Sequence, residues 1–490
     1  MANIANIPDE ILEHVFIYVT DLDYIDIFEV RLVNKRFCKI ATPLRVRHWS
    51  DRGYYGPYNT SLSRTTINRL ALELLRYPEL RLQVRSLEID WFRNDHGNGT
   101  PRHLIRPENL DLLARAAEET LPDLTGSTDL CEQIRQGWDD GIAVLVLAWT
   151  KNLTNLSLTI PSHIRAKDEN GYLLLVLHFA KQVALRFAFD DPKSALPLPL
   201  EKLHTLNIQY ENLDSELHVA HLSPFLHFPN LKSFSAYRIG DGKGRDLSYV
   251  VASTENNYSM PFPERTSLLE SICIEEPLLS DAGIRSLLHV CKNLKVFRME
   301  CSNAIGPRSS TMLARSLVEH ASSLEEVTLF IEDIDEGHWT PDSADTDELP
   351  ECWKAFRKLK RAGIPIQHLL QMEDVNDPTT AKLNPGRLPE SLEHLTIFHH
   401  QLHDVRMQLG YFHQALSGDT LKKFESDRHQ ALVSIQMLLE GTRPTGHLKK
   451  LKTIDFSDAL LDDPIAEEIR IVKDLAKERG VEFILGRAKR

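Results

Sequence analysis

The sequence predicts an α/β protein in which a short helical segment precedes a long, irregular array of strand–helix repeats. Apolar residues three and four positions apart at the start of the chain indicate the helices. Further along, a unit of the form apolar-x-x-apolar-x-apolar recurs, and its period-two alternation indicates short strands. The chain has 490 residues, more than one hydrophobic core usually serves, so we expect an extended array or several units.

The amino-terminal segment predicts three helices. Pro8 suits the first helical turn, where its missing N–H is not needed, and the acids after it favour the positive end of the helix dipole. One apolar face comprises Ile11, Leu12, Val15, Phe16 and Val19. A break at Thr20-Asp21 precedes the second helix, and the third begins near Arg31 and ends before Pro43. Three short helices cannot bury all their apolar side chains among themselves, so the remaining face predicts a partner.

The motifs of this segment resemble an F-box. That pattern reads Leu-Pro-x-Glu-(Leu/Ile), then an apolar helix, Asp-Leu, and Val-Cys-(Lys/Arg)-x-(Trp/Phe). Here Ile7-Pro8-Asp9-Glu10-Ile11 matches the first part, Asp26-Ile27 takes the Asp-Leu place, and Val33-Asn34-Lys35-Arg36-Phe37 takes the last. The chain departs from the pattern in Asn34, which replaces Cys, and in a longer loop before Asp26.

The resemblance implies that the segment docks the Skp adaptor of Skp–cullin–F-box ubiquitin ligases, and through it a cullin–RING ligase. The adaptor-binding residues predicted on this basis are Ile7, Pro8, Ile11, Leu12, Val15, Phe16, Ile27, Val30, Val33 and Phe37. The alternative is that these helices only cap the repeat array.

Nine copies of the apolar unit follow the helical segment. They begin at Val84, Leu153, Leu203, Leu231, Leu269, Leu294, Leu324, Leu392 and Leu451. After the copy at Leu269, Ser280 predicts the start of a helix with an apolar face of Ile284, Leu287, Leu288 and Cys291. One repeat later, a second helix is predicted from Leu313, Ala314, Leu317, Val318 and Ala321. Copies spaced 25 and 30 residues apart here are close to the leucine-rich-repeat period of about 20–29 residues.

Each strand–helix unit buries its apolar face only against its neighbours, so we expect a curved, mostly parallel sheet with outer helices. The Asn or Cys that usually follows each strand in leucine-rich repeats is largely missing, so the predicted solenoid is irregular. We divide the chain into an F-box (1–48), a helical linker and cap (49–80) and a degenerate leucine-rich-repeat domain (81–490) with inserts near 94–140 and 331–390. The segment before Val84 is similar to the start of the repeats in many fungal F-box proteins.

Residues just past the predicted strands would line one rim of the curved sheet. Large aromatics and arginine carry much of the binding energy at interfaces, so we predict target-binding residues there, with edge packing as the alternative. They are Trp91, Phe92, Tyr210, Tyr237 and Arg238. Segment 331–351 holds nine acids and no Lys or Arg, which predicts a solvated loop or a surface for a basic partner. The basic residues from Lys354 to Arg361 predict a helix that follows it.

Composition disfavours several classes of protein. The net charge of −13 disfavours nucleic-acid binding, and no apolar run approaches the roughly 18–20 residues that span a bilayer. The six cysteines are scattered without close pairs, and no secretory signal opens the chain, so we expect a reduced protein in the cytoplasm or nucleus. We find no specific catalytic motif, and we predict no enzyme activity, cofactor or metal. The histidines at 399, 400 and 403 are interpreted as loop residues.

These patterns predict a substrate-recognition adaptor of a Skp–cullin–F-box ubiquitin ligase. The F-box would bind the Skp adaptor, and the repeats would hold a target protein near a charged conjugating enzyme, so that catalysis comes from proximity. A Skp-bound interaction scaffold that does not direct degradation shares every motif and stays an alternative. An enzyme with a site hidden in the inserts has no supporting residues.

Overall fold

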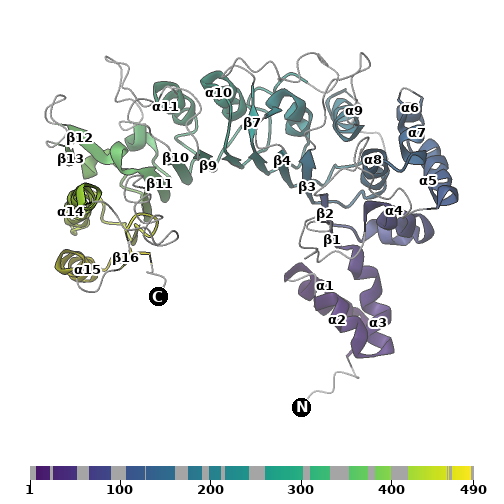
Figure 1. The fold of residues 1–490 in the computed structure, drawn as a ribbon, viewed down its shortest axis with the longest axis horizontal. Coiled ribbons are helices and arrows are strands. Elements are labelled where there is room, and N and C mark those ends of the chain that lie inside the picture. The colour runs from purple at the N-terminus through teal and green to yellow at the C-terminus, as the bar shows by residue number, and fades with distance from the viewer. Residues whose placement is uncertain are drawn as a thin grey trace. The chain divides into compact units, whose positions relative to one another are not determined.

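The structure is a computed structural model that describes residues 7–22, 26–51, 66–89, 106–126, 128–160, 175–189, 198–210, 216–241, 260–301, 310–331, 352–372, 381–398, 418–460, 462 and 466–486. The chain is an α/β protein with a large, mostly parallel sheet. It divides into two compact units, Met1–Ile239 with Leu247–Leu268 and Gly240–Asp246 with Leu269–Arg490. Both units appear in Figure 1.

The first unit begins with a three-helix module that has its own core. Helices α1 (Asp9–Leu22), α2 (Asp26–Val33) and α3 (Lys35–Ala41) are followed by the 3-10 helix η2 (Thr42–Val46). The core comprises Leu12, Phe16, Ile27, Phe37, Ala41 and Leu44. The rings of Phe16 and Phe37 meet edge to face with centroids 5.1 Å apart, a geometry that aromatic pairs favour.

The helix boundaries in this module differ from the prediction. Helix α1 continues through Thr20-Asp21 to Leu22, so the expected break lies later. The third helix begins at Lys35 rather than near Arg31, because Asn34 caps it: the Asn34 side chain accepts a hydrogen bond of 2.8 Å from the Phe37 N–H. The departure from the F-box pattern at Asn34 therefore places a strong capping residue at a helix start.

Five parallel strands form the sheet of the first unit, in the order β1, β2, β3, β4, β6. The strands of this unit are β1 (His48–Ser50), β2 (Ser86–Ile89), β3 (Asn155–Ile160), β4 (Thr205–Tyr210), the short β5 (Leu217–His218) and β6 (Ser233–Tyr237). Its other helices are α4 (Ile67–Arg76), η3 (Pro78–Leu82), α5 (Pro107–Thr120), α6 (Pro122–Thr125), α7 (Leu130–Arg135), α8 (Asp139–Trp149), α9 (Leu175–Phe189) and η5 (Val219–His227). The short β7 (Ile239–Gly240) lies at the boundary with the second unit.

Seven parallel strands form the sheet of the second unit, in the order β8, β9, β10, β11, β14, β15, β16. They are β8 (Ser271–Glu275), β9 (Val296–Cys301), β10 (Glu326–Ile331), β11 (Arg361–Pro365), β14 (His394–Phe398), β15 (Thr453–Asp455) and β16 (Glu482–Ile484). The separate strands β12 (Leu370–Met372) and β13 (Ala381–Leu383) pair antiparallel. The helices are α10 (Asp281–His289), α11 (Ser310–Val318), η6 (Trp353–Ala355), η7 (Ile366–Leu369), η9 (Pro385–Arg387), α14 (Gly418–Glu440) and α15 (Glu467–Arg479).

The apolar unit of the sequence explains the strands. In β3, Leu156, Leu158 and Ile160 are buried while the residues between them are partly exposed, and Leu153 is buried in the turn before the strand. Figure 1 shows α8 and α9 to one side of the strands of the first unit, and α10 and α11 to one side of β9 and β10 in the second. Each sheet therefore has a helix-covered face and an open face, and the open face carries the residues that alternate with the buried ones.

The predicted helix after Ser280 is confirmed. The Ser280 hydroxyl accepts a hydrogen bond of 3.2 Å from the Gly283 N–H at the start of α10, and Ile284, Leu287 and Leu288 are buried. In α11, Leu313, Ala314 and Leu317 are buried as expected, but Val318 is exposed. The basic helix predicted over Lys354–Arg361 is wrong, since that segment contains η6, a turn and the first residue of β11.

Candidate functional site

The three-helix module exposes large apolar side chains above its core. Helices α1 and α2 are 14 and 8 residues long, yet they hold six of the thirteen exposed large hydrophobic side chains among the described residues. We call these six the exposed apolar set: Ile11, Val15, Tyr18, Phe28, Leu32 and Val33. Leu32 is 85% exposed and Tyr18 is 66% exposed, which is unusual for apolar residues clustered in two adjacent helices.

The spacing of these residues explains their exposure. Ile11, Val15 and Tyr18 lie at offsets 0, 4 and 7 and share one stripe of α1, while Leu12 and Phe16 share the neighbouring stripe that faces the core. In α2, Phe28 and Leu32 are four positions apart and are exposed, while Ile27 is buried. Each helix therefore has a core stripe and a second apolar stripe that the module itself leaves uncovered.

The predicted adaptor-binding residues divide between these two stripes. Ile11, Val15 and Val33 belong to the exposed apolar set, and Pro8 is exposed beside them. Leu12, Phe16, Ile27 and Phe37 form the core of the module, and Ile7 and Val30 are partly buried against it. Tyr18, Phe28 and Leu32 were absent from the predicted set, although the i, i+4, i+7 spacing on α1 was a signal that could have found the first of them.

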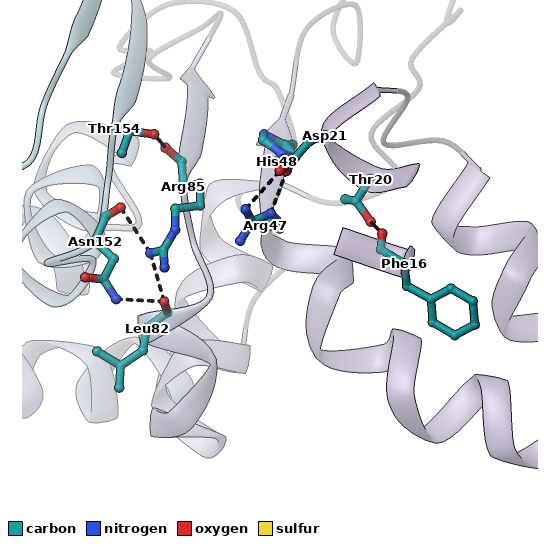
Figure 2. Close-up of polar contacts among 9 residues, drawn as sticks. All are labelled: Phe16, Thr20, Asp21, Arg47, His48, Leu82, Arg85, Asn152 and Thr154. Carbon is teal, nitrogen blue, oxygen red and sulfur yellow. Dashed lines mark hydrogen bonds and ion pairs between the residues drawn. The ribbon is translucent and has the colours of Figure 1, made fainter. Parts of the chain in front are cut away.

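The end of α1 is joined to the start of the sheet by ion pairs, shown in Figure 2. The Asp21 carboxylate accepts hydrogen bonds from the Arg47 guanidinium at 2.6 and 3.1 Å, and it lies 2.7 Å from Nε2 of His48, the first residue of β1. The hydrogen bond from Arg47 is the largest cause that lowers the pKa of Asp21; partial burial opposes it, and His48 lowers the pKa further. A second ion pair joins Arg45 in η2 to Glu73 in α4.

Backbone and side-chain bonds continue from this junction across the first sheet. The Arg85 N–H donates to the Arg47 carbonyl at 2.8 Å, and the Thr154 N–H donates to the Arg85 carbonyl at 2.8 Å. The Arg85 guanidinium donates to the carbonyls of Leu82 and Asn152 at 3.1 and 3.2 Å (Figure 2). Desolvation and then the charge of Arg47 lower the pKa of Arg85, while Asp21 raises it. Asp21 therefore offsets the positive charge of two neighbouring arginines.

The open face of the first sheet is polar and mostly uncharged. Its residues in β3, β4 and β6 pair in register and include Ser157, Thr159, Asn207, Gln209 and Ser235. The Asn207 amide donates to the Ser157 hydroxyl at 3.2 Å. Such a face offers hydrogen bonds to a partner but little apolar area.

The open face of the second sheet carries charge and aromatic rings. Glu326 in β10 accepts a hydrogen bond of 2.7 Å from Arg298 in β9 and lies 3.4 Å from Arg361 in β11. Further along the strands, Glu275 pairs in register with Glu300, and Glu300 pairs with Phe330. The second open face therefore holds several groups that can contribute strongly to binding.

Three of the five predicted target-binding residues, Tyr210, Tyr237 and Arg238, lie among the described residues. Trp91 and Phe92 lie outside the described residues, as do the acidic segment between Ile331 and Cys352 and the three histidines after β14. Tyr210 ends β4 and is buried, with only 5% of its surface exposed. Tyr237 ends β6 on the open face and is partly exposed, and Arg238 follows it with a φ of 55°. Tyr210 and Tyr237 therefore point to opposite faces of the sheet.

The chain matches no protein-family model and no curated protein sequence. Within the described ranges, no group of three or more His, Cys, Asp or Glu side chains is arranged to hold a metal ion. Among the same residues, no helix combines the length and the apolar character that crossing a bilayer requires.

Proposed function

We propose that the chain is a substrate-recognition subunit of a Skp–cullin–F-box ubiquitin ligase, in which the three-helix module binds the Skp adaptor and the repeat sheets bind a target protein. The observation that carries this proposal is the exposed apolar set, which lies on the helices whose motifs resemble an F-box. Burying one Leu, Val or Phe side chain contributes about 1.5–3 kcal/mol, so a partner that covers several of these six would bind firmly.

The core of the module supports the same proposal. Leu12, Phe16, Ile27 and Phe37 already pack together, so the exposed residues are not needed to complete the fold of the module. The residues that resemble the F-box pattern thus include both a group that holds the helices together and a group that faces outward. A docking surface requires both.

The junction at Asp21 supports the second half of the proposal. A receptor that works by proximity must hold its target at a fixed place relative to the adaptor, because a loose link dilutes the effective concentration of the reacting groups. The bonds of Asp21 with Arg47 and His48 join the module to the start of β1, and the Arg45–Glu73 pair joins it to α4 of the same unit. We infer that the module and this sheet move as one body.

The test is co-purification of the full chain with the Skp adaptor after substitution of exposed residues. We expect the double variant Ile11→Asp, Leu32→Asp to lose adaptor binding at least about thirtyfold, because it places two charges in an apolar interface. Both positions are exposed, so the module should stay folded, unlike in variants of Leu12 or Phe37, which lie in its core.

The matched control is Ile471→Asp on α15 in the second unit. Ile471 is 48% exposed, close to the 52% of Ile11, so the substitution changes a similar apolar surface away from the module. We expect adaptor binding of this variant to equal that of the unchanged chain. Equal binding by the module variant, with its circular dichroism unchanged, would overturn the proposed docking surface.

A further inference from the structure

Two carboxylates lie side by side on the open face of the second sheet. Glu275 is the last residue of β8 and pairs in register with Glu300 of β9, and both side chains are exposed. Adjacent strands are about 4.8 Å apart, so the two negative charges are close neighbours. Like charges directly opposite each other on neighbouring strands destabilise a sheet.

Two aromatic rings continue the same row. Phe330 of β10 pairs in register with Glu300, and its ring meets that of Phe398 of β14 edge to face with centroids 4.9 Å apart. Strand β11 runs between these two strands. The rings meet across it because Gly363 has no side chain: a Cβ there would lie 3.1 Å from Cε2 of Phe398. We call Glu275, Glu300, Phe330 and Phe398 the acidic–aromatic row.

The charge of the two carboxylates is not balanced within the row. Among the described residues, neither carboxylate forms an ion pair, and the nearby Arg298 bonds to Glu326 instead. Partial desolvation raises the pKa of Glu300, and the charges of Glu275 and Asp458 raise it further, while Arg298 lowers it. Ionisation of Glu300 is therefore unfavourable by comparison with a free carboxyl group, and a cation bound nearby would make it more favourable.

At the amino-terminal ends of the same strands, in contrast, the charged residues form ion pairs with one another. The residues that precede these strands alternate in sign: Glu270, Lys295, Glu325, Lys360, Glu393 and Lys452. Ion pairs join Lys295 to Glu270 at 2.8 Å and Lys360 to Glu325 at 2.9 Å, and another joins Lys452 to Glu393. The second unit thus pairs its charges where the strands begin and leaves two acids unbalanced beside two partly exposed rings where the strands end.

We propose that the acidic–aromatic row binds a lysine- or arginine-bearing segment of a partner protein. A guanidinium or ammonium group fits both halves of the row, because carboxylates pair with it and the faces of phenylalanine rings attract it. This inference rests on the proposed function only in taking the segment as part of a target for the ligase.

The test measures binding of a fluorescein-labelled glycine–arginine repeat peptide to the full chain by fluorescence anisotropy at low salt. We expect the double variant Glu275→Gln, Glu300→Gln to bind about tenfold more weakly, since it keeps the side-chain shapes and removes both charges. The variant Phe398→Leu, which keeps an apolar side chain but removes the ring, should bind about threefold more weakly. A glycine–glutamine repeat peptide should not bind the unchanged chain.

The matched control removes the same number of charges elsewhere. Asp474 and Glu478 are exposed residues of α15, so the double variant Asp474→Asn, Glu478→Gln has the same net charge as the row variant. We expect its affinity for the arginine peptide to stay within about twofold of the unchanged chain. Equal losses in both double variants would mean non-specific attraction to the net charge, and that result, or no binding by the unchanged chain, overturns the proposal.

The measurement uses no adaptor, so its failure is separable from failure of the proposed function. A chain that binds the Skp adaptor but not the peptide would keep the ligase proposal and reject the row as its target site. Because the glutamine variant removes a repulsion, it should unfold at the same urea concentration as the unchanged chain or a higher one.

Discussion

The sheets of the two units balance their charges in different ways. Along the edge where the strands begin, the first unit carries Arg47, Arg85, Thr154, His204 and Lys232, each bonded through its backbone to the next. No acid stands in this row. The corresponding row of the second unit alternates acid and base from Glu270 to Lys452 and contains its own ion pairs.

This difference in charge explains how the amino-terminal module is attached to the first sheet. The first row obtains its negative charge from Asp21, which comes from the end of α1 rather than from a neighbouring strand. The second row contains both acids and bases, so its charges are balanced within the row. The module has a separate core, but its Asp21 also supplies the negative charge that balances the arginines at the start of the first sheet.

The largest expected effect concerns a buried acid, Asp140, which forms no ion pair with any residue that the structure describes. Asp140 is fully buried and accepts hydrogen bonds from the N–H groups of Leu175 and Val176 at 2.6 and 3.1 Å, whereas the buried Glu326 of the second unit lies between two arginines. Burial raises the pKa of Asp140 from 3.8 to about 7. Its contribution to stability is therefore present below pH 3.8 and is lost as the pH rises to about 7.

We predict that Asp140→Asn makes the stability of the first unit less dependent on pH. The unchanged chain should lose about 4 kcal/mol from this group between pH 4 and pH 8, and the variant should lose almost none of it. Urea unfolding at several pH values measures the slope, with Asp474→Asn on exposed α15 as the control that should leave it unchanged. A slope that survives in Asp140→Asn would contradict this assignment.

The next effect compares the open faces of the two sheets. A side chain at Gly363 would meet Cγ2 of Thr328 at 3.0 Å and the ring of Phe398 at 3.1 Å, so Gly363→Val must displace one of them. We expect a loss of about 2 kcal/mol in the free energy of unfolding. The same residue introduced on the polar open face of the first unit, by Ser235→Val, should change stability by no more than about 0.5 kcal/mol. Similar losses at both positions would mean that the aromatic pair has no special packing.

The smallest effect tests the charge of the first row directly. Asp21→Asn keeps the shape of the side chain but leaves Arg47 and Arg85 without their negative neighbour. We expect the free energy of unfolding to fall by about 1 kcal/mol, since Asp21 is partly exposed and the pair is screened by solvent. The effect should vanish as the pH falls below 3.8, because Arg47 and His48 lower the pKa of Asp21 in the folded state.

Asp462→Asn in the second unit provides the control for Asp21→Asn. Asp462 pairs with Lys473 at 2.6 Å, and its side chain is 44% exposed, against 43% for Asp21. It belongs to an isolated surface pair, so we expect a change of no more than about 0.5 kcal/mol. A loss as large as that of Asp21→Asn would remove the distinction between the two units.

Most of the strands could be predicted from the sequence. All nine copies of the apolar unit coincide with strands, because each places two or three large apolar residues on the helix-covered face. In the large sheet, β1, β11 and β16 were not predicted, and neither were the short strands β5, β7, β12 and β13 outside it. In β1 and β16 one apolar position of the unit is missing, because Asp51 and Gly480 stand there, and β11 has Ala362 and Gly363 where large residues usually stand.

The helix predicted over Lys354–Arg361 is wrong because basic residues there contact residues that are distant in the sequence. Lys360 and Arg361 suggested a helical face, but they bond to Glu325 and Glu326 of the preceding repeat, 35 positions away in each case. Likewise, Phe330 and Phe398 come together through the spacing of repeats of unequal length, which no local pattern reveals. The exposed apolar set was partly predictable, since it depends on helical spacing within α1 and α2.

Hydrogen–deuterium exchange of the full chain, with and without the Skp adaptor, shows whether the exposed apolar set on α1 and α2 is the adaptor-binding surface. We expect the adaptor to slow exchange in α1 and α2 and to leave exchange in the strands β8 to β16 unchanged. Protection confined to the sheets, or no protection in the presence of saturating adaptor, would contradict this expectation.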